Sequence, residues 1–162
     1  MKKITFILMT CLMTIYAQAQ TYKFYQTQNY HNQLRLNTKT GEVYQIQDNG
    51  LTMLVNSAIT PDSDTPYRYF LVETRNIWTF ILVDSFTGKI WQTQFSIKGS
   101  EYRFSIPIND RSLSNSKVSK FSVQPMTSMY QFYLINEDTG EMWKFQWTNK
   151  KNDSYRWIEK IR

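Results

Sequence analysis

The chain has 162 residues with a formal net charge of +6, and 16% of its residues are aromatic. A chain of this length can bury one sizeable core, so a single domain suffices. Cys11 is the only cysteine and His31 the only histidine, which excludes a disulfide framework and a zinc site built from the usual ligands.

The N-terminal segment has the pattern of a secretory signal peptide. Two lysines follow the first methionine, residues 4–16 form an apolar run, and Ala17 and Ala19 frame a small-x-small cleavage site. The pattern is typical of bacterial export, and we expect residues 1–19 to be removed after Ala19. The location is then the periplasm or the exterior. The run is too short for a bilayer of roughly 30 Å, so no membrane span is expected after cleavage.

One short stretch occurs three times in the remaining chain. It begins with an apolar residue and Asn or Asp, continues to Thr-Gly, and is followed by an apolar residue and Tyr or Trp. An Asn or Asp side chain can bond the backbone two residues on, and glycine adopts a left-handed conformation without steric penalty, so each stretch predicts a hairpin turn. The turn residues are Asn37, Thr40 and Gly41, then Asp84, Thr87 and Gly88, then Asn136, Thr139 and Gly140.

The flanks of each turn alternate β-branched and aromatic residues, as antiparallel strands do. Tyr44, Trp91 and Trp143 fall at one offset from their glycines, and we expect all three to face the core. The turns recur roughly every 50 residues, a period typical of repeat proteins. The predicted strands are 22–27, 32–37, 42–47 and 51–56, then 67–73, 77–84, 89–96 and 101–106, then 120–123, 129–136, 141–147 and 154–159.

Three units of four short antiparallel strands predict one all-β domain over residues 20–162, with repeats at approximately 20–60, 67–108 and 118–162. Two architectures can hold such units. In a three-bladed, propeller-like arrangement each unit is a four-stranded antiparallel meander. In a β-trefoil the three units share one barrel. We prefer the propeller-like arrangement and keep the trefoil as the alternative.

The stretch from Asp84 to Trp91 resembles the hairpin of β-propeller blades of the quinoprotein type, in which Asp-x-x-Thr-Gly precedes a tryptophan. The resemblance implies a blade-like meander for each unit. The tryptophan comes one residue earlier than in the quinoprotein pattern, and no cofactor is expected. Closed propellers usually have at least four blades, so three blades would be splayed or would pair with another chain.

The search for catalytic residues gives none. His31 occupies the position that Trp78 and Tyr130 hold in the other units, which predicts a structural role rather than a general base. Asp62 and Asp64 alternate as calcium ligands do, but no distal glutamate is in register, so we expect a surface linker and no metal site.

The surplus of aromatic residues gives the main indication of function. Trp147, Arg156 and Trp157 are candidate binding residues, because exposed tryptophans stack on sugars or anchor a protein partner. Alternatively, both tryptophans fill the core of the third unit. The leading hypothesis is a secreted, non-enzymatic binding or interaction module for a glycan or for an envelope or secreted protein.

Two other functions remain open. An assembly protein would pair with copies of itself or a neighbour through exposed strand edges. A small hydrolase, the least favoured function, would use an unrecognised carboxylate site among Glu73, Glu101 and Glu137. The excess of basic residues from Lys144 to Arg162 is interpreted as a solvated terminus, and no nucleic-acid partner is expected.

Overall fold

The computed structural model describes residues 20–114, 119–150 and 153–162. These residues form three separate four-stranded antiparallel sheets, in each of which consecutive strands pair. The predicted signal peptide, with Ala17 and Ala19, lies outside the described residues.

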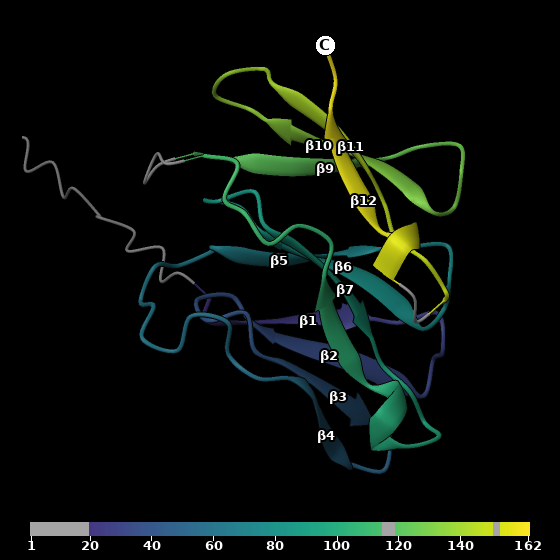
Figure 1. Ribbon diagram of the computed structural model, residues 1–162. Coiled ribbons are helices and arrows are strands. Elements are labelled where there is room, and N and C mark those ends of the chain that lie inside the picture. The colour runs from purple at the N-terminus through teal and green to yellow at the C-terminus, as the bar shows by residue number, and fades with distance from the viewer. Residues whose placement is uncertain (1–19, 115–118, 151–152) are drawn as a thin grey trace, which may run out of the picture.

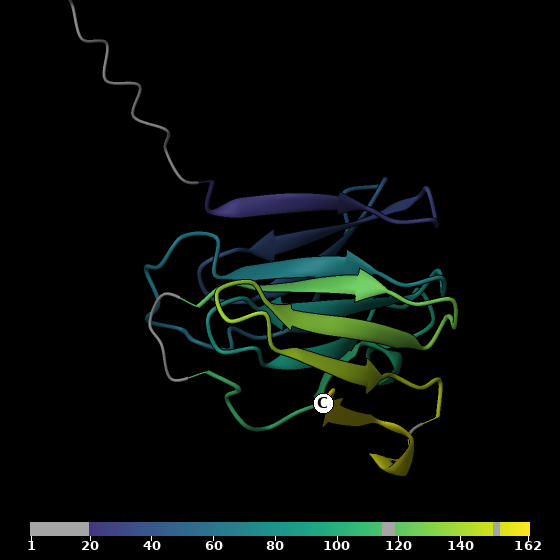
Figure 2. The ribbon, with the colours of Figure 1, turned by 90° about the horizontal axis from the view of Figure 1, so that it is seen from above.

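The sheets follow one another in space in chain order, from the first at the bottom of Figure 1 to the third at the top. Figure 2 shows that the first strands of the three sheets run in the same direction. The first sheet contains β1 (Tyr22–Gln26), β2 (Asn32–Asn37), β3 (Val43–Gln47) and β4 (Thr52–Asn56). The second contains β5 (Tyr69–Glu73), β6 (Thr79–Asp84), β7 (Ile90–Gln94) and β8 (Phe104–Pro107). The third contains β9 (Phe121–Pro125), β10 (Gln131–Asn136), β11 (Met142–Gln146) and β12 (Trp157–Lys160).

This architecture confirms the all-β, three-repeat, propeller-like fold. The three sheets share no strand pairing within the described residues and do not close into one barrel, so the trefoil alternative does not hold. Two predicted strands, 101–106 and 154–159, begin later, at Phe104 and Trp157, because a 3₁₀ helix precedes each. Residues 100–102 form a short 3₁₀ helix, η1 (Ser100–Tyr102), because Tyr102 N donates to Gly99 O (3.2 Å) and Arg103 N to Ser100 O (3.0 Å). A second one, η2 (Asp153–Tyr155), precedes β12.

The three Thr-Gly hairpin turns share one set of hydrogen bonds. In the first turn, Asn37 Oδ1 accepts from Lys39 N (3.0 Å) and Thr40 N (3.3 Å), and Gly41 N donates to Asn37 O (2.9 Å). Asp84 and Asn136 make the equivalent bonds in their turns. The three glycines have φ angles of 77°, 69° and 73°, in the left-handed region where a Cβ is penalised.

The second turn uses an aspartate where the other two use asparagine. The Asp84 carboxylate is almost fully buried and accepts from Arg68 Nη2 at 2.8 Å and from Arg68 Nε at 3.1 Å. This side-chain hydrogen bond raises the pKa of the Arg68 guanidinium above its ordinary value. An ion pair of two donors to one carboxylate therefore ties the start of the second sheet to its own hairpin turn.

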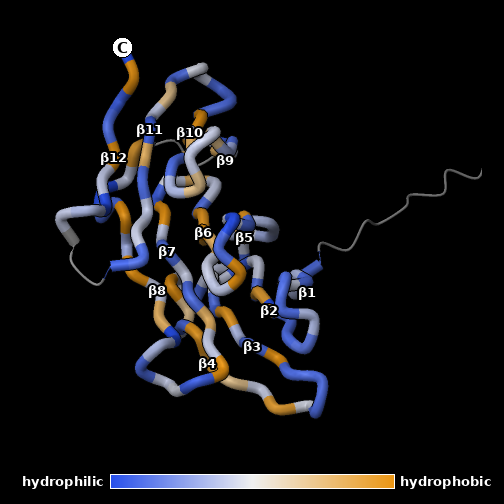
Figure 3. Tube along the Cα trace, turned by 90° about the vertical axis from the view of Figure 1, so that its right-hand side faces the viewer, coloured by the Kyte–Doolittle hydropathy of each residue, from blue (hydrophilic) through white to orange (hydrophobic). Residues whose placement is uncertain are grey.

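Two hydrophobic cores lie between the three sheets, so the middle sheet is covered on both faces. In Figure 3 the hydrophobic segments lie mainly in the strands of all three sheets. The first core joins Leu34, Leu36 and Val43 of the first sheet to Tyr69, Leu71, Phe80, Leu82 and Phe95 of the second. The second core joins Ile81, Val83 and Ile90 of the second sheet to Phe121, Phe132, Leu134, Trp143, Phe145 and Trp147 of the third.

Tyr44, Trp91 and Trp143 occupy equivalent positions on the sheet face that is directed toward the preceding sheet. Trp143 is buried in the second core and half-buried Trp91 packs against the first. Tyr44 belongs to the first sheet, so its ring lies on the outward face, 4.9 Å from the Arg35 guanidinium. The expectation that all three face the core therefore fails for Tyr44, because among the described residues no sheet precedes its own.

The same backbone contact joins each pair of consecutive sheets. Tyr69 N, at the start of β5, donates to Thr38 O at 2.9 Å, and Phe121 N, at the start of β9, donates to Ser85 O at 2.9 Å. The rings of these two residues also cover the turn glycines of the preceding sheet. A Cβ on Gly41 would lie 3.0 Å from the Tyr69 ring, and one on Gly88 would lie 2.8 Å from the Phe121 ring.

A buried glutamine in the third strand adds a polar contact at each junction. Gln45 Oε1 of the first sheet accepts from Ser96 N of the second at 3.3 Å. Gln92 of the second sheet donates from Nε2 to Thr148 O of the third at 2.7 Å and accepts from Thr148 N at 3.3 Å. Ser96 and Thr148 occupy the same repeat position, so the two junctions use equivalent glutamine contacts.

Burial of Tyr69 predicts a loss of stability at alkaline pH. Its ring is almost fully buried and its hydroxyl lies 2.7 Å from Thr60 Oγ1. Burial, the larger cause, raises the Tyr69 pKa above its ordinary value of 10.0, while the Thr60 hydrogen bond lowers it. The folded chain holds this proton more tightly than the unfolded chain. The stability that protonated Tyr69 contributes is therefore fully present below the pKa of the unfolded chain, and it is lost as pH rises through the pKa of the folded chain.

We therefore expect the free energy of unfolding to fall above about pH 10 less steeply in Tyr69→Phe than in wild type. At pH 8 the variant should be less stable by about 1 kcal/mol, because it lacks the hydroxyl hydrogen bond. Urea unfolding between pH 8 and pH 11 measures both effects. Tyr30→Phe, at a ring that is 74% exposed, serves as the control and should follow wild type. Identical slopes for wild type and Tyr69→Phe would contradict the assignment.

Candidate functional site

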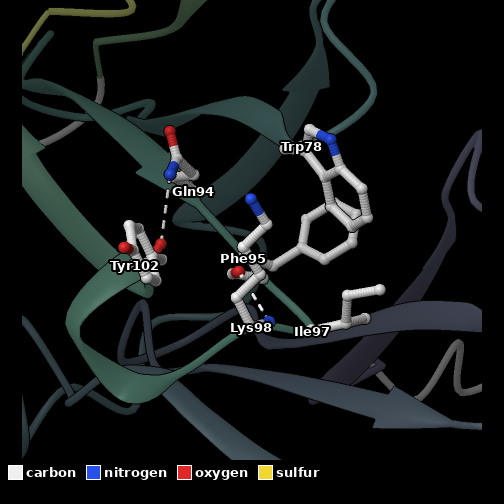
Figure 4. A pocket seen from close by; sticks show the side chains of 7 residues that line it. Trp78, Gln94, Phe95, Ile97, Lys98 and Tyr102 are labelled. Atoms are coloured by element: carbon white, nitrogen blue, oxygen red, sulfur yellow. Dashed lines mark hydrogen bonds between the residues drawn. The ribbon is translucent and has the colours of Figure 1, made fainter.

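A hollow of about 230 Å³ opens at the end of the second sheet that lies away from its Thr-Gly turn (Figure 4). It lies between the loop that joins β5 to β6 and the segment that leads from β7 into η1. We call it the aromatic hollow. Its lining residues are Trp78, Gln94, Phe95, Ser96, Ile97, Lys98 and Tyr102.

The aromatic wall of this hollow is held by a short-range hydrogen-bond network. Thr74 Oγ1 donates to Thr79 O at 2.7 Å, and Trp78 N donates to Asn76 Oδ1 at 2.9 Å, so the loop that carries Trp78 is closed at its base. The Trp78 ring lies 5.3 Å from the Phe95 ring at an angle of 56°. Phe95 is fully buried and Trp78 half-buried, so Phe95 supports the Trp78 ring from the core.

Polar groups converge on the hollow from the opposite side. Gln94 Nε2 donates to Tyr102 O at 3.1 Å, which ties the third strand to η1 (Figure 4). Tyr102 is 41% exposed, and exposed Lys98 also lines the hollow. The hollow thus combines apolar ring surface with an amide, a phenol and an ammonium group, the usual composition of a small-molecule site.

A second hollow of about 180 Å³ adjoins the first, since Gln94 and Tyr102 line both. It lies at the junction of the second and third sheets, and its other lining residues are Gln92, Phe104, Thr148, Asn149 and Lys150. We call the two hollows together the groove. The groove places one lysine in each half, and the Lys150 ammonium lies 4.4 Å from the centre of the Tyr155 ring.

The structure does not bring Trp147, Arg156 and Trp157 together into one site. Trp147 is fully buried between the second and third sheets, where its indole N–H donates to Met129 O at 3.0 Å. Arg156 is buried behind the groove, and its Nε donates to Gln92 Oε1 at 2.9 Å. Trp157 is half-buried on the outward face of the third sheet, 5.5 Å from the Lys144 ammonium.

His31 pairs with an aspartate where the other repeats pair two aromatic rings. Its Nδ1 lies 2.8 Å from Asp48 Oδ2, and the two side chains are 61% and 62% exposed. The corresponding pairs are Trp78 with Phe95, and Tyr130 with Trp147 at 5.0 Å. In both of those pairs the second ring is fully buried between sheets. The polar pair is therefore a feature of the outward face of the first sheet, where no described sheet covers it.

The acidic residues considered for hydrolysis lie apart. Glu73 and Glu137 line two different hollows and both are exposed, while Glu101 lies in η1. The hollow that contains Glu137 measures about 320 Å³ and also contains Tyr67, whose φ of 55° is strained for a residue with a side chain. This hollow lies at the second and third Thr-Gly turns, where Ser85 Oγ donates to Arg68 O at 2.8 Å.

Within the described residues, no three His, Asp or Glu side chains are grouped so that they could hold a metal ion. Among the same residues, no helix has the length and apolar character needed to cross a membrane. Comparison with protein-family models, with curated proteins and with solved structures gives no match to this chain. Function is therefore inferred from the geometry of the groove and of the sheet faces.

Sequence reasoning missed most of the groove. Trp78 falls at the structural aromatic position of the repeat, and Tyr102 falls within the predicted strand 101–106. Lys98 and Gln94 carried no motif. One signal is present in the sequence: Gly99 and Tyr102 lie between the third and fourth strands of the second unit, in a connection able to carry a site.

Proposed function

We propose that the protein is a secreted, non-enzymatic binding module that holds a short glycan in the groove. The observation that carries the proposal is the pairing of an aromatic wall with convergent polar groups around Gln94 and Tyr102. A sugar ring has an apolar C–H face that packs on aromatic rings and a rim of hydroxyl groups that bond amides and ammonium groups. Trp78 and Tyr102 supply the rings, and Gln94 supplies the amide.

The shape of the groove supports a ligand of more than one ring. Each hollow is smaller than the roughly 300–1,000 Å³ of sites for drug-sized ligands, so each suits a single ring. Because Gln94 and Tyr102 line both hollows, consecutive rings of one oligosaccharide can occupy them together. Lys98 and Lys150 lie one in each half, which favours sugars that carry carboxylates over neutral ones.

The absence of acid–base groups from the groove supports binding without catalysis. The described residues that line the two hollows include no carboxylate and no histidine. Glycoside hydrolysis in most enzymes requires two carboxylates about 5–10 Å apart across the scissile bond. Secretion of the module follows from the signal-peptide pattern of residues 1–19, and an extracellular or periplasmic protein meets envelope glycans.

We expect Tyr102→Ala to weaken glycan binding by about tenfold or more, because truncation of a central aromatic contact costs more than about 1.4 kcal/mol. Isothermal titration with neutral hexose oligosaccharides and with oligouronates measures the effect and ranks the two ligand classes. Tyr30→Ala, an exposed tyrosine on the first sheet's loops, serves as the matched control and should bind as wild type does.

Trp157→Ala separates the groove from the outward face of the third sheet. If the groove is the site, Trp157→Ala binds as wild type does, since its ring lies on the other side of the sheet from the second core. Saturable binding of neither ligand class would overturn the proposal. Loss of binding in Trp157→Ala with retention in Tyr102→Ala would move the site to the outward face.

A further inference from the structure

We propose that two copies of the chain close into a six-bladed ring. In this ring the outward face of the third sheet of each copy packs on the outward face of the first sheet of the other copy. The inference starts from the two junctions inside one chain, which use the same three contacts. The outward faces of the first and third sheets carry residues at the same repeat positions as the residues that make those contacts.

The first contact is the backbone bond with its ring-on-glycine packing. Tyr22 holds in β1 the position that Tyr69 and Phe121 hold in β5 and β9, since each lies opposite the Asn or Asp of its own turn. Tyr22 is 44% exposed. At the other end, Gly140 has nothing within 4 Å of its Cβ position, whereas Gly41 and Gly88 are covered by a ring. In the assembly, the Tyr22 ring of one copy would cover Gly140 of the other copy. The Tyr22 backbone N–H would donate to Glu137 O of that other copy.

The second contact is the apolar packing between sheets. The outward face of the first sheet carries Phe24 and Leu54, which are 54% and 44% exposed, beside Tyr22 and half-buried Tyr44. Arg35 lies among these side chains, with its guanidinium 5.3 Å from the centre of the Tyr22 ring and 4.9 Å from the centre of the Tyr44 ring. Exposed apolar surface of this kind marks an interaction site in soluble proteins. The outward face of the third sheet presents half-buried Tyr133, Ile135 and Met142, which replace Leu34, Leu36 and Val43 of the first sheet in repeat position.

The third contact is polar. At this contact the two outward faces carry side chains of opposite charge, where the internal junctions use a glutamine. Lys144 replaces Gln45 and Gln92, the glutamines that reach forward to the next sheet. On the receiving side Asp48 precedes Asn49, which is the repeat equivalent of Ser96 and Thr148. In a junction built by the same rule, the Lys144 ammonium meets Asn49 O and the Asp48 carboxylate, which also lies 2.8 Å from His31 Nδ1 of its own chain.

The number of copies follows from the geometry of a head-to-tail contact. Such a contact produces a closed ring when its rotation closes and a filament when it does not. Closed propellers have about four to eight blades, and six is the only multiple of three in that range. Two chains of three blades therefore close the ring. The groove forms within one chain, so this assembly and the glycan proposal stand or fall separately.

Charge reversal tests the assembly with protein purified from cells that express the full chain. Wild type should sediment as a dimer in analytical ultracentrifugation. Lys144→Glu and Asp48→Lys each place like charges at both junctions and should each raise the dimer dissociation constant at least about tenfold. An equimolar mixture of the two variants restores an opposite-charge pair at both junctions and should form a heterodimer. Lys98→Glu makes the same charge change inside the groove and should dimerise as wild type does.

Four outcomes would overturn the proposal. They are a wild-type monomer at high concentration, open oligomers that grow with concentration, a dimer insensitive to both single variants, and single variants that stay monomeric when mixed. Both altered residues have side chains on outward faces, and thermal unfolding of each variant establishes that it is folded before sedimentation is compared.

Discussion

Replacing Gly88 with valine should destabilise the protein by about 2–6 kcal/mol, from two additive causes. Gly88 has a φ of 69°, a conformation that costs a β-branched residue about 1–3 kcal/mol. A Cβ at this position would also lie 2.8 Å from the Phe121 ring, which is almost fully buried in the second core. The ring cannot move away without disturbing the packing of its neighbours, so a second cost of about 1–3 kcal/mol is added.

A matched glycine separates these two causes. Gly50 has a φ of 83°, and nothing lies within 4 Å of its Cβ position, so Gly50→Val introduces the backbone strain alone. Urea unfolding of both variants at pH 7 measures the difference. Gly88→Val should be less stable than Gly50→Val by at least about 1 kcal/mol. Equal losses would mean that the Phe121 ring contributes nothing at this junction.

The hairpins could be predicted because their cause is local. An Asn or Asp oxygen accepts from the amides two and three residues on, and a left-handed glycine closes the turn. In the first hairpin all of these interactions lie between Asn37 and Gly41. Repetition of the turn with apolar alternation then gave the strand order within each sheet. The 3₁₀ helix at Ser100–Tyr102 escaped prediction, because Tyr102, Phe104 and Ile106 alternate in sequence as a strand would.

Which face of a sheet is covered could not be predicted from one repeat. Tyr44 and Trp143 share an offset from their glycines, yet Trp143 is buried and Tyr44 faces outward. The difference lies in the presence of a preceding sheet, a property of the order of the sheets and not of the residue. The same reason separates Trp147, buried between two sheets, from Trp157 on an outward face. Aromatic content alone therefore could not locate the groove.

Exchange of Gln92 for leucine should cost about 2–4 kcal/mol, because the side chain satisfies three buried partners. It donates to Thr148 O, accepts from Thr148 N, and accepts from Arg156 Nε at 2.9 Å. Leucine has a similar volume but no polar atoms, so Thr148 loses both backbone partners and the Arg156 guanidinium loses one. Each buried polar group left without its partner costs about 1–3 kcal/mol, which exceeds the gain from burying a more apolar side chain.

The neighbouring glutamine supplies the control for this exchange. Gln94 is half-buried and donates one bond, to Tyr102 O, so water can replace the amide in Gln94→Leu and the loss should stay below about 1 kcal/mol. Urea unfolding of the two variants measures the contrast, and circular dichroism verifies that both retain the sheets. A Gln92→Leu chain as stable as Gln94→Leu would show that the second and third sheets are held by apolar packing alone. In that case the glutamine contacts between sheets could not explain why a lysine, Lys144, stands at this repeat position on the outward face of the third sheet.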